Sequence, residues 1–428
     1  MRIGLRERSI LVIGYVAFLV YAFPGYLSTD SQNQLMEARS GHFTDAHPPL
    51  MSAMWRVLDM VVSGPVLMLV LQSGLFLGGL YVVFRRVLSP RAAAWTASAI
   101  LLFPPVMTPL AVIWKDSQMA GFLVAGIAAV LGAQLRIRLL GLGLLVLACA
   151  VRHNAFAAVV PLVFFLFEWR HGMRWWKRTA IVGGAAVFAV LAMLLISRIL
   201  TVQSIKMTPA FQDIVGVLAF ADDKSDEELR DTLAGLELVS DRDLQQRCRR
   251  LYELRGAWRI TQGDEALMRL PDTDEEWRAL SRAWKTLVLS EPHAYLSYHW
   301  DTYKPMIGLP ERPRAPVYNL FVEVDAAADE IRHNASYSKA QRYAARVLYW
   351  VADETPLFRP WIYAVTALLL LILFARDRVT IGIITSGLVY ELSYLPVGAD
   401  PDFRYSHWMI TATVIATVML VIQRRRAA

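Results

Sequence analysis

Carboxylate, cationic and imidazole side chains gather in a few short segments between long apolar runs of this chain. Asp30 lies in STDSQ, and Arg404 lies in DFRY near the other end. Between them, IWKDSQ holds Lys115 and Asp116. A carboxylate can take a proton from an attacking hydroxyl, while lysine and arginine neutralise charge on a departing phosphate. These residue types therefore fit transfer of a group from a phosphate-linked donor.

The candidates divide by the role that their side chains can play. Asp30 fits a general base, with Asp116 as the second catalytic candidate; an Asp of ordinary pKa, about 3.9, would act late, as the hydroxyl becomes acidic. Arginine can hold phosphate oxygens in a bidentate fork, and lysine provides a point charge. The expected donor phosphate-binding residues are Lys115, Arg152, Arg404 and His47. The secondary candidates are Asp45, His153, Glu391 and Tyr405.

Each candidate also has a plain structural interpretation. Asp30 could simply cap a helix that begins at SQNQLMEA, because Asp is a preferred N-cap residue. The cations could reach toward lipid headgroups, although Arg404 lies on the side of the membrane where few cations are expected. A lone interfacial histidine is more often structural. Glu391 lies within an apolar run, which implies either a role or a buried partner.

Metal and nucleotide sites have weaker support. His293, His299 and Asp301 lie in EPHAYLSYHWDTY, but their spacing fits no standard ligand pattern, and aromatic packing explains the segment better. Asp30 and Asp116 would suit a mechanism with or without a divalent cation. We therefore expect no certain cofactor, with a divalent metal left open. The sequence contains no Gly-rich phosphate loop and no nucleic-acid signal.

The elements that must position these residues are apolar helices. Apolar residues make up 56% of the 428 residues, the mean hydropathy is +0.38, and the apolar residues occur in blocks. About ten blocks are long enough for a hydrocarbon core of roughly 30 Å. They are 9–25, 63–84, 92–112, 117–135, 137–151, 154–168, 178–199, 360–375, 379–397 and 405–423. The pattern predicts an all-α polytopic membrane protein.

Basic clusters predict the orientation. If Arg2, Arg6 and Arg8 are cytoplasmic, alternation of the spans puts the later clusters on the same side. These are Arg85, Arg86, Arg91, Arg136, Arg138, Arg170, Arg174, Lys177, Arg178, Arg376, Arg378 and the terminal RRR. Both termini are then cytoplasmic and the polar motifs external, most simply at a bacterial inner membrane.

The external segments contain the rest of the polar sequence. The first external loop, 26–62, is expected to hold two interfacial helices, since Pro48 and Pro49 would begin the second. A charged segment, 201–356, is expected to form a mostly helical external insert. It would lie between an N-terminal module, 1–200, and C-terminal transmembrane helices, 357–428.

The first external loop resembles that of the GT-C class of polyprenyl-phosphate-sugar transferases, which includes protein O-mannosyltransferases and lipid A aminoarabinose transferases. Those enzymes share about seven helices and a first loop with two interfacial helices and an acidic residue, similar to residues 2–200. The resemblance implies Asp30 as the catalytic carboxylate, and it implies further motifs in WKD at 114–116, in VRHN and in DFRY. It covers about half of the chain, because the insert and the last three spans are not typical.

The resemblance implies inverting transfer of a sugar, hexose or pentose, from a polyprenyl-phosphate-linked donor to an external glycan, lipid or protein acceptor. Membrane lipids would be further partners. A glycan polymerase or ligase would use the same face. A transporter or flippase would place ionisable residues and broken helices near the bilayer midplane, often in two related halves, whereas here those positions are apolar and no repeat is evident. An acyltransferase would need a nucleophile pair that does not stand out, and a structural scaffold remains the simplest alternative.

Overall fold

The computed structural model divides the chain into two compact units. The larger unit contains Met1–Gln203, Arg312–Ser393 and Asp402–Ala428, and the smaller contains Ser204–Glu311 and Tyr394–Pro401. The described residues are 4–45, 47–167, 173–201, 208–221, 224–239, 243–254, 257–261, 266–310, 312–325, 330–335, 338–398 and 400–427. Within these ranges the chain is predominantly helical.

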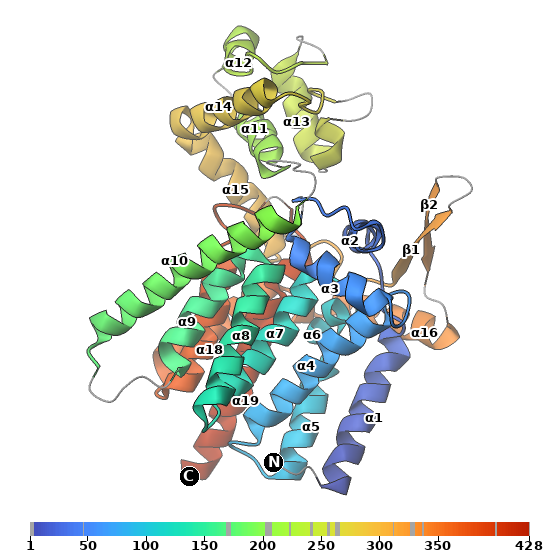
Figure 1. The fold of residues 1–428 in the computed structure, drawn as a ribbon, viewed down its shortest axis with the longest axis vertical. Coiled ribbons are helices and arrows are strands. Elements are labelled where there is room, and N and C mark those ends of the chain that lie inside the picture. Colours follow the sequence, from blue (N-terminus) through green and yellow to red (C-terminus); the bar gives the residue numbers. More distant parts are fainter. Residues whose placement is uncertain are drawn as a thin grey trace. The chain divides into compact units, whose positions relative to one another are not determined.

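The larger unit is a bundle of helices (Figure 1). Its first half contains α1 (Leu5–Ala22), α2 (Thr29–Ser40), α3 (Pro49–Asp59), α4 (Val66–Phe84), α5 (Pro90–Leu101), α6 (Pro104–Leu110), α7 (Lys115–Val130), α8 (Leu135–Val151), η1 (His153–Ala155), α9 (Phe156–Leu166) and α10 (Trp175–Leu200). Its second half contains α16 (Lys339–Glu354), η3 (Pro356–Phe358), α17 (Pro360–Leu369), the π-helical turn η4 (Leu370–Phe374), α18 (Arg378–Leu392), η5 (Phe403–Ser406) and α19 (His407–Ala427). An antiparallel hairpin, β1 (Leu320–Asp325) and β2 (Glu330–Ala335), precedes α16.

Each apolar run expected from the sequence is occupied by a helix in the described part of the chain. Two of the described helices are long and apolar enough to cross a membrane, namely Val66–Phe84 and Phe403–Arg426. The pair α5 and α6 would make a third if its 69° bend lies within one span. Helices α7, α8, α9, α17 and α18, on other runs, each contain fewer than the 18 residues required of a single spanning helix.

Glycines allow the central helices of the bundle to approach closely. A Cβ on Gly121 of α7 would lie 2.6 Å from the Gln72 carbonyl oxygen of α4. On the opposite flank, a Cβ on Gly141 of α8 would lie 2.5 Å from the Val130 backbone nitrogen. Small residues at such contacts let helix backbones approach, as is typical of apolar bundles. Helix α7, whose first turn carries two candidate residues, is therefore held tightly between α4 and α8.

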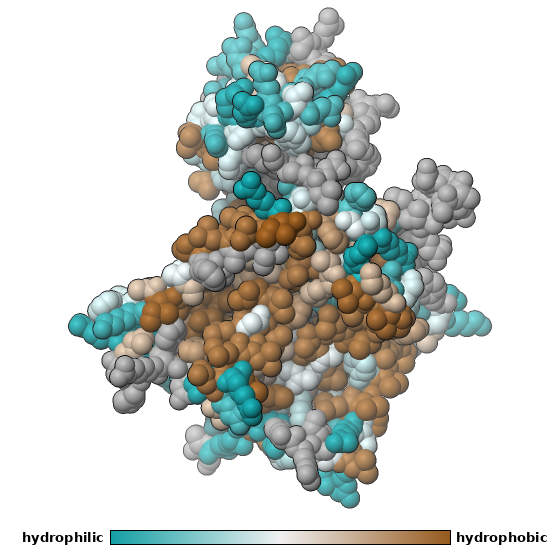
Figure 2. Space-filling view, viewed as in Figure 1, coloured by the Kyte–Doolittle hydropathy of each residue, from teal (hydrophilic) through white to brown (hydrophobic). Residues whose placement is uncertain are grey.

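The surface of the larger unit is broadly apolar over its helices (Figure 2). Val57, Met60 and Val61, at and just beyond the end of α3, are 63%, 72% and 74% exposed. Ile199 of α10 is 71% exposed. A continuous apolar surface of this kind marks contact with a partner or with lipid.

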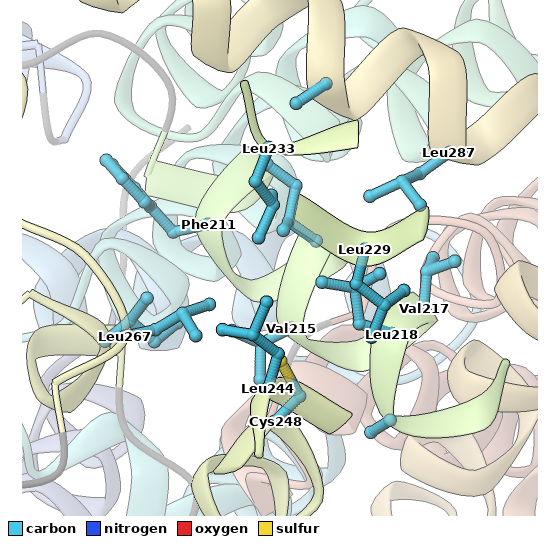
Figure 3. Close-up of a cluster of buried hydrophobic side chains, with 14 of the residues drawn as sticks. Phe211, Val215, Val217, Leu218, Leu229, Leu233, Leu244, Cys248, Leu267 and Leu287 are labelled. Atoms are coloured by element: carbon cyan, nitrogen blue, oxygen red, sulfur yellow. The ribbon is translucent and has the colours of Figure 1, made fainter. Parts of the chain in front are cut away.

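The smaller unit has a hydrophobic core of its own (Figure 3). Its elements are α11 (Thr208–Phe220), α12 (Asp226–Thr232), α13 (Leu244–Leu254), η2 (Ala257–Ile260), α14 (Asp274–Ser290) and α15 (Pro292–Met306). Leucines and valines from α11 to α14 surround Cys248, which is fully buried. This unit is shorter than the expected insert, 201–356, because residues 312–356, with the hairpin and α16, belong to the larger unit.

Candidate functional site

The first turn of α2 presents Asp30 without using it as the cap. Ser28 is the N-cap: its hydroxyl accepts from the Ser31 backbone nitrogen, and the Ser31 hydroxyl completes a capping box. Asp30 lies in the first turn, where the helix dipole favours a negative charge. The interpretation of Asp30 as an N-cap residue is therefore wrong, because Ser28 already satisfies that end of the helix.

The half-buried carboxylate of Glu37 fastens α2 to the start of α3. One oxygen of Glu37 accepts from the backbone nitrogen and the hydroxyl of Thr44, at 3.1 and 2.6 Å, and the other accepts from the Ser52 hydroxyl at 2.7 Å. Helix α2 ends at Gly41, whose positive φ of 77° favours glycine, and α3 begins at Pro49. The expected pair of short helices in 26–62 is present, and their connection carries His47.

Backbone pairing brings α2 and α7 together. The Tyr26 nitrogen donates to the Ala111 carbonyl at 3.0 Å, and the Ile113 nitrogen donates to the Tyr26 carbonyl at 2.9 Å. The Ser31 hydroxyl also donates to the Ile113 carbonyl at 2.7 Å. Because both segments lead directly into helices, these bonds place the first turn of α2 beside the first turn of α7, where Lys115 lies.

A 3-10 turn, η5, brings Arg404 to the same place. The Phe403 nitrogen donates to the Arg314 carbonyl at 2.9 Å, and the Phe403 ring is buried. Glu391 of α18 supports this turn, because its Oε1 accepts from the Ser406 hydroxyl at 2.7 Å. Because Glu391 is only 2% exposed, it affects the site indirectly, through its hydrogen bond to Ser406 in the turn that carries Arg404.

Arg404 bridges two carboxylates. Its Nη1 donates to Asp30 Oδ2 at 2.9 Å, and its Nε lies 3.2 Å from Asp402 Oδ2. The guanidinium carbon lies 4.9 Å from the Trp114 ring centroid and 5.2 Å from that of Tyr405. Aromatic faces favour a cation at such distances. Arg404 is thus oriented by charge and by stacking, with its side chain 11% exposed.

His47 connects Lys115 to Asp30. Its Nδ1 lies 2.9 Å from Lys115 Nζ, and its Nε2 lies 3.9 Å from Asp30 Oδ1. Burial and the Lys115 charge lower the pKa of His47 to about 4. A neutral ring that accepts from the ammonium at Nδ1 carries its proton on Nε2, which faces Asp30.

The carboxylate of Asp30 is ionised at neutral pH. Burial raises the pKa of Asp30, but the Arg404 and Lys115 charges lower it further, to well below its ordinary range. The side chain is 32% exposed, so a ligand can reach it. An anionic carboxylate, two cations and a neutral imidazole thus share one partly open site.

Asp116 and Arg152 form a separate buried pair. Arg152 Nη1 donates to Asp116 Oδ2 at 2.9 Å, and the two side chains are 8% and 0% exposed. A base must be reached by the proton that it accepts. The fully buried Asp116 therefore lacks the access that its proposed catalytic role requires, and Arg152 is committed to it while also lying 5.1 Å from the Tyr405 ring centroid.

Compared with protein-family models, curated proteins and solved structures, the chain matches none. The geometry of the cluster is therefore the basis for any statement about its chemistry.

The remaining candidates lie around this cluster. Asp45 is exposed in the α2–α3 connection, and His153 is exposed at the start of η1. No group of three or more His, Cys, Asp or Glu side chains that could hold a metal ion occurs among the described residues. Asp402 was not predicted, although its place two residues before Arg404 in the same external segment was a usable signal.

Lowering the pH should destabilise the protein through His47. Its folded-state pKa, about 4, lies below its ordinary value, so the folded state binds fewer protons than the unfolded chain between these values. The contribution of the neutral ring is complete above about pH 6.5 and is lost as the pH falls toward 4, by about 2 kcal/mol between pH 7 and pH 5. We expect the Tm in nanodiscs to fall less over this interval in His47→Asn than in wild type. His42→Asn, on the exposed part of the same loop, is the matched control and should behave as wild type; equal falls in all three proteins would refute the assignment.

Proposed function

We propose that this chain is a membrane glycosyltransferase that moves a sugar from a polyprenyl-phosphate-linked donor to an acceptor at the external face of the membrane. The observation that carries the proposal is the partly open cluster in which the ionised Asp30 lies beside Arg404, Lys115 and His47. A phosphate needs such cations, and an attacking hydroxyl needs such a carboxylate. The likeness of the first loop to the GT-C class is part of the same proposal.

The membrane topology is part of the proposal. We propose about ten spans, with both termini cytoplasmic and the cluster at the external surface. Within the larger unit, the two termini lie at one end of the bundle and α2 and α3 lie at the opposite end (Figure 1). The broad apolar surface of the bundle supports its burial in lipid.

The chemistry needs one proton transfer and one substitution. The acceptor hydroxyl oxygen would attack the anomeric carbon while its proton passes to Asp30. The bond from that carbon to the phosphate oxygen would break, and the oxygen would keep the electron pair as part of the lipid phosphate. Lys115 and Arg404 would neutralise this charge, and attack opposite the leaving group would invert the anomeric centre.

An apolar cavity of about 340 Å³ suits the lipid part of the donor. It lies between α8, α9 and α10 and includes Cys149, one turn before Arg152, and Phe156, just after η1. Its other lining residues are also apolar, among them Leu142, Val160, Phe167 and Val182. A prenyl chain could therefore leave the polar cluster along a surface of matching polarity.

Purified protein in nanodiscs should transfer radiolabelled sugar from at least one member of a panel of polyprenyl-phosphate sugars. Arg404→Lys keeps the charge but loses the fork, so we expect it to raise the KM for the active donor by about tenfold or more. Arg39→Lys, at an exposed arginine of α2, is the control and should leave KM unchanged. Labelled products that grow into long chains would indicate a polymerase. Transfer of a preassembled glycan in one step would indicate a ligase. Movement of the donor across the bilayer without any transfer would indicate a flippase.

A further inference from the structure

Helix α16 has two unlike faces. Its buried face consists of Gln341, Ala345, Leu348 and Ala352. The opposite face exposes Tyr343, Val347 and Trp350, at 65%, 42% and 61%. Positions three and four apart lie on one side of a helix, so these three side chains form a single stripe. Aligned apolar and aromatic side chains mark an interaction surface, unlike a single exposed hydrophobe.

Both ends of α16 adjoin the ends of proposed spans. Nε2 of Gln341 donates to the carbonyl of Tyr21 at 3.2 Å and to that of Phe23, where α1 ends (Figure 1). At its other end, α16 leads through η3 into α17, which begins at Pro360. In the proposed topology both points lie at the external surface of the bilayer. A helix that joins them must run along that surface.

Cations accompany the exposed stripe. Lys339 and Arg346 are exposed on α16, and the Arg346 guanidinium lies 5.9 Å from the Tyr343 ring centroid. On the same helix, Asp353 is paired with Arg312. Tyrosine and tryptophan favour the membrane interface, and cations beside them attract anionic headgroups.

We infer that α16 lies in the headgroup layer of the outer leaflet and binds anionic phospholipid through Tyr343, Val347, Trp350, Lys339 and Arg346. The inference rests on the proposed membrane topology and is independent of the transfer chemistry. It assigns to the membrane surface a helix that the sequence places within an external insert.

Site-directed fluorescence tests this position. The two free cysteines, Cys149 and Cys248, are buried and can be replaced by alanine. An environment-sensitive probe on Val347→Cys in phosphatidylcholine–phosphatidylglycerol vesicles should be quenched by headgroup-nitroxide lipid and protected from aqueous iodide, each by about twofold or more relative to Arg342→Cys. Arg342 lies about 100° away from the centre of the stripe and is the matched control.

A probe on Val70→Cys separates the inference from the topology. Val70 is 44% exposed on α4, a helix long and apolar enough to span, so acyl-chain nitroxides should quench its probe. Quenching at Val70 with none at Val347 would overturn the inference and leave the topology intact. No quenching at either position would overturn both.

The charge of the lipid provides the final arm of the test. Nitroxide carried on phosphatidylglycerol should quench the Val347 probe more strongly than nitroxide carried on phosphatidylcholine. In the double variant Lys339→Gln/Arg346→Gln, the ratio of quenching by phosphatidylglycerol nitroxide to quenching by phosphatidylcholine nitroxide should fall to about one. If the quenching ratio is near one even in the protein that keeps both cations, anionic-lipid binding is refuted. If the probe is protected from iodide only when another protein is added, the stripe is a site for a protein partner instead.

Discussion

Asp30→Asn should reduce kcat for sugar transfer by about 100- to 10,000-fold while the protein stays folded. Asparagine has nearly the same shape and can still accept a hydrogen bond from Arg404 at the position now held 2.9 Å away. It cannot take the proton of the acceptor hydroxyl, so the loss should appear in kcat and not mainly in KM. Donor turnover by the two purified proteins, at equal Tm, measures the effect.

Asp402→Asn is the sharpest control for that result. Asp402 is the second carboxylate beside Arg404, 3.2 Å from its Nε, so this variant removes the same charge from the same guanidinium. If Asp30 only orients Arg404, the two variants should lose similar activity. If Asp30 is the base, Asp402→Asn should retain kcat within about tenfold and mainly change the donor KM.

Arg152→Gln should lower the free energy of unfolding by about 3–5 kcal/mol. The change leaves the Asp116 carboxylate, which is 0% exposed, without its charged partner at 2.9 Å. Asp116→Asn should cost a similar amount, because it leaves the guanidinium uncompensated. In the double variant the two amides can bond to one another, so its loss should be well below the sum of the single losses. Denaturant titration in bicelles measures all three.

The exposed pair Arg39 and Asp59 provides the comparison at similar geometry. Its N–O distance is 3.0 Å, but the Arg39 side chain is 51% exposed, so Arg39→Gln should cost about 1 kcal/mol or less. If Arg152→Gln and Arg39→Gln lower the free energy of unfolding equally, burial is not what makes the first pair important for stability. Transfer by the folded Asp116→Asn/Arg152→Gln protein then assigns the pair: retained activity means a structural bridge, and lost activity means that Arg152 also serves the donor.

The sequence by itself determined where the helices lie and which segments are polar. Apolar blocks such as 63–84 predict helices because composition and length are local properties of the sequence. Helix α4 occupies that block. The pair Pro48 and Pro49 was enough to predict the start of α3, because proline suits the first helical turn and α3 begins at Pro49. The list of candidate site residues drawn from the polar segments likewise contained Asp30, Lys115 and Arg404.

Only the tertiary structure decided which of these residues meet. Asp30 and Arg404 are 374 positions apart, and they are joined because backbone bonds hold α2 to α7 and a buried phenylalanine holds the turn that carries Arg404. Asp116, adjacent to Lys115 in sequence, instead faces the interior and Arg152. Local patterns set the face and the end of a helix on which a side chain lies. Its partner, however, depends on how distant helices pack, and no local spacing records that.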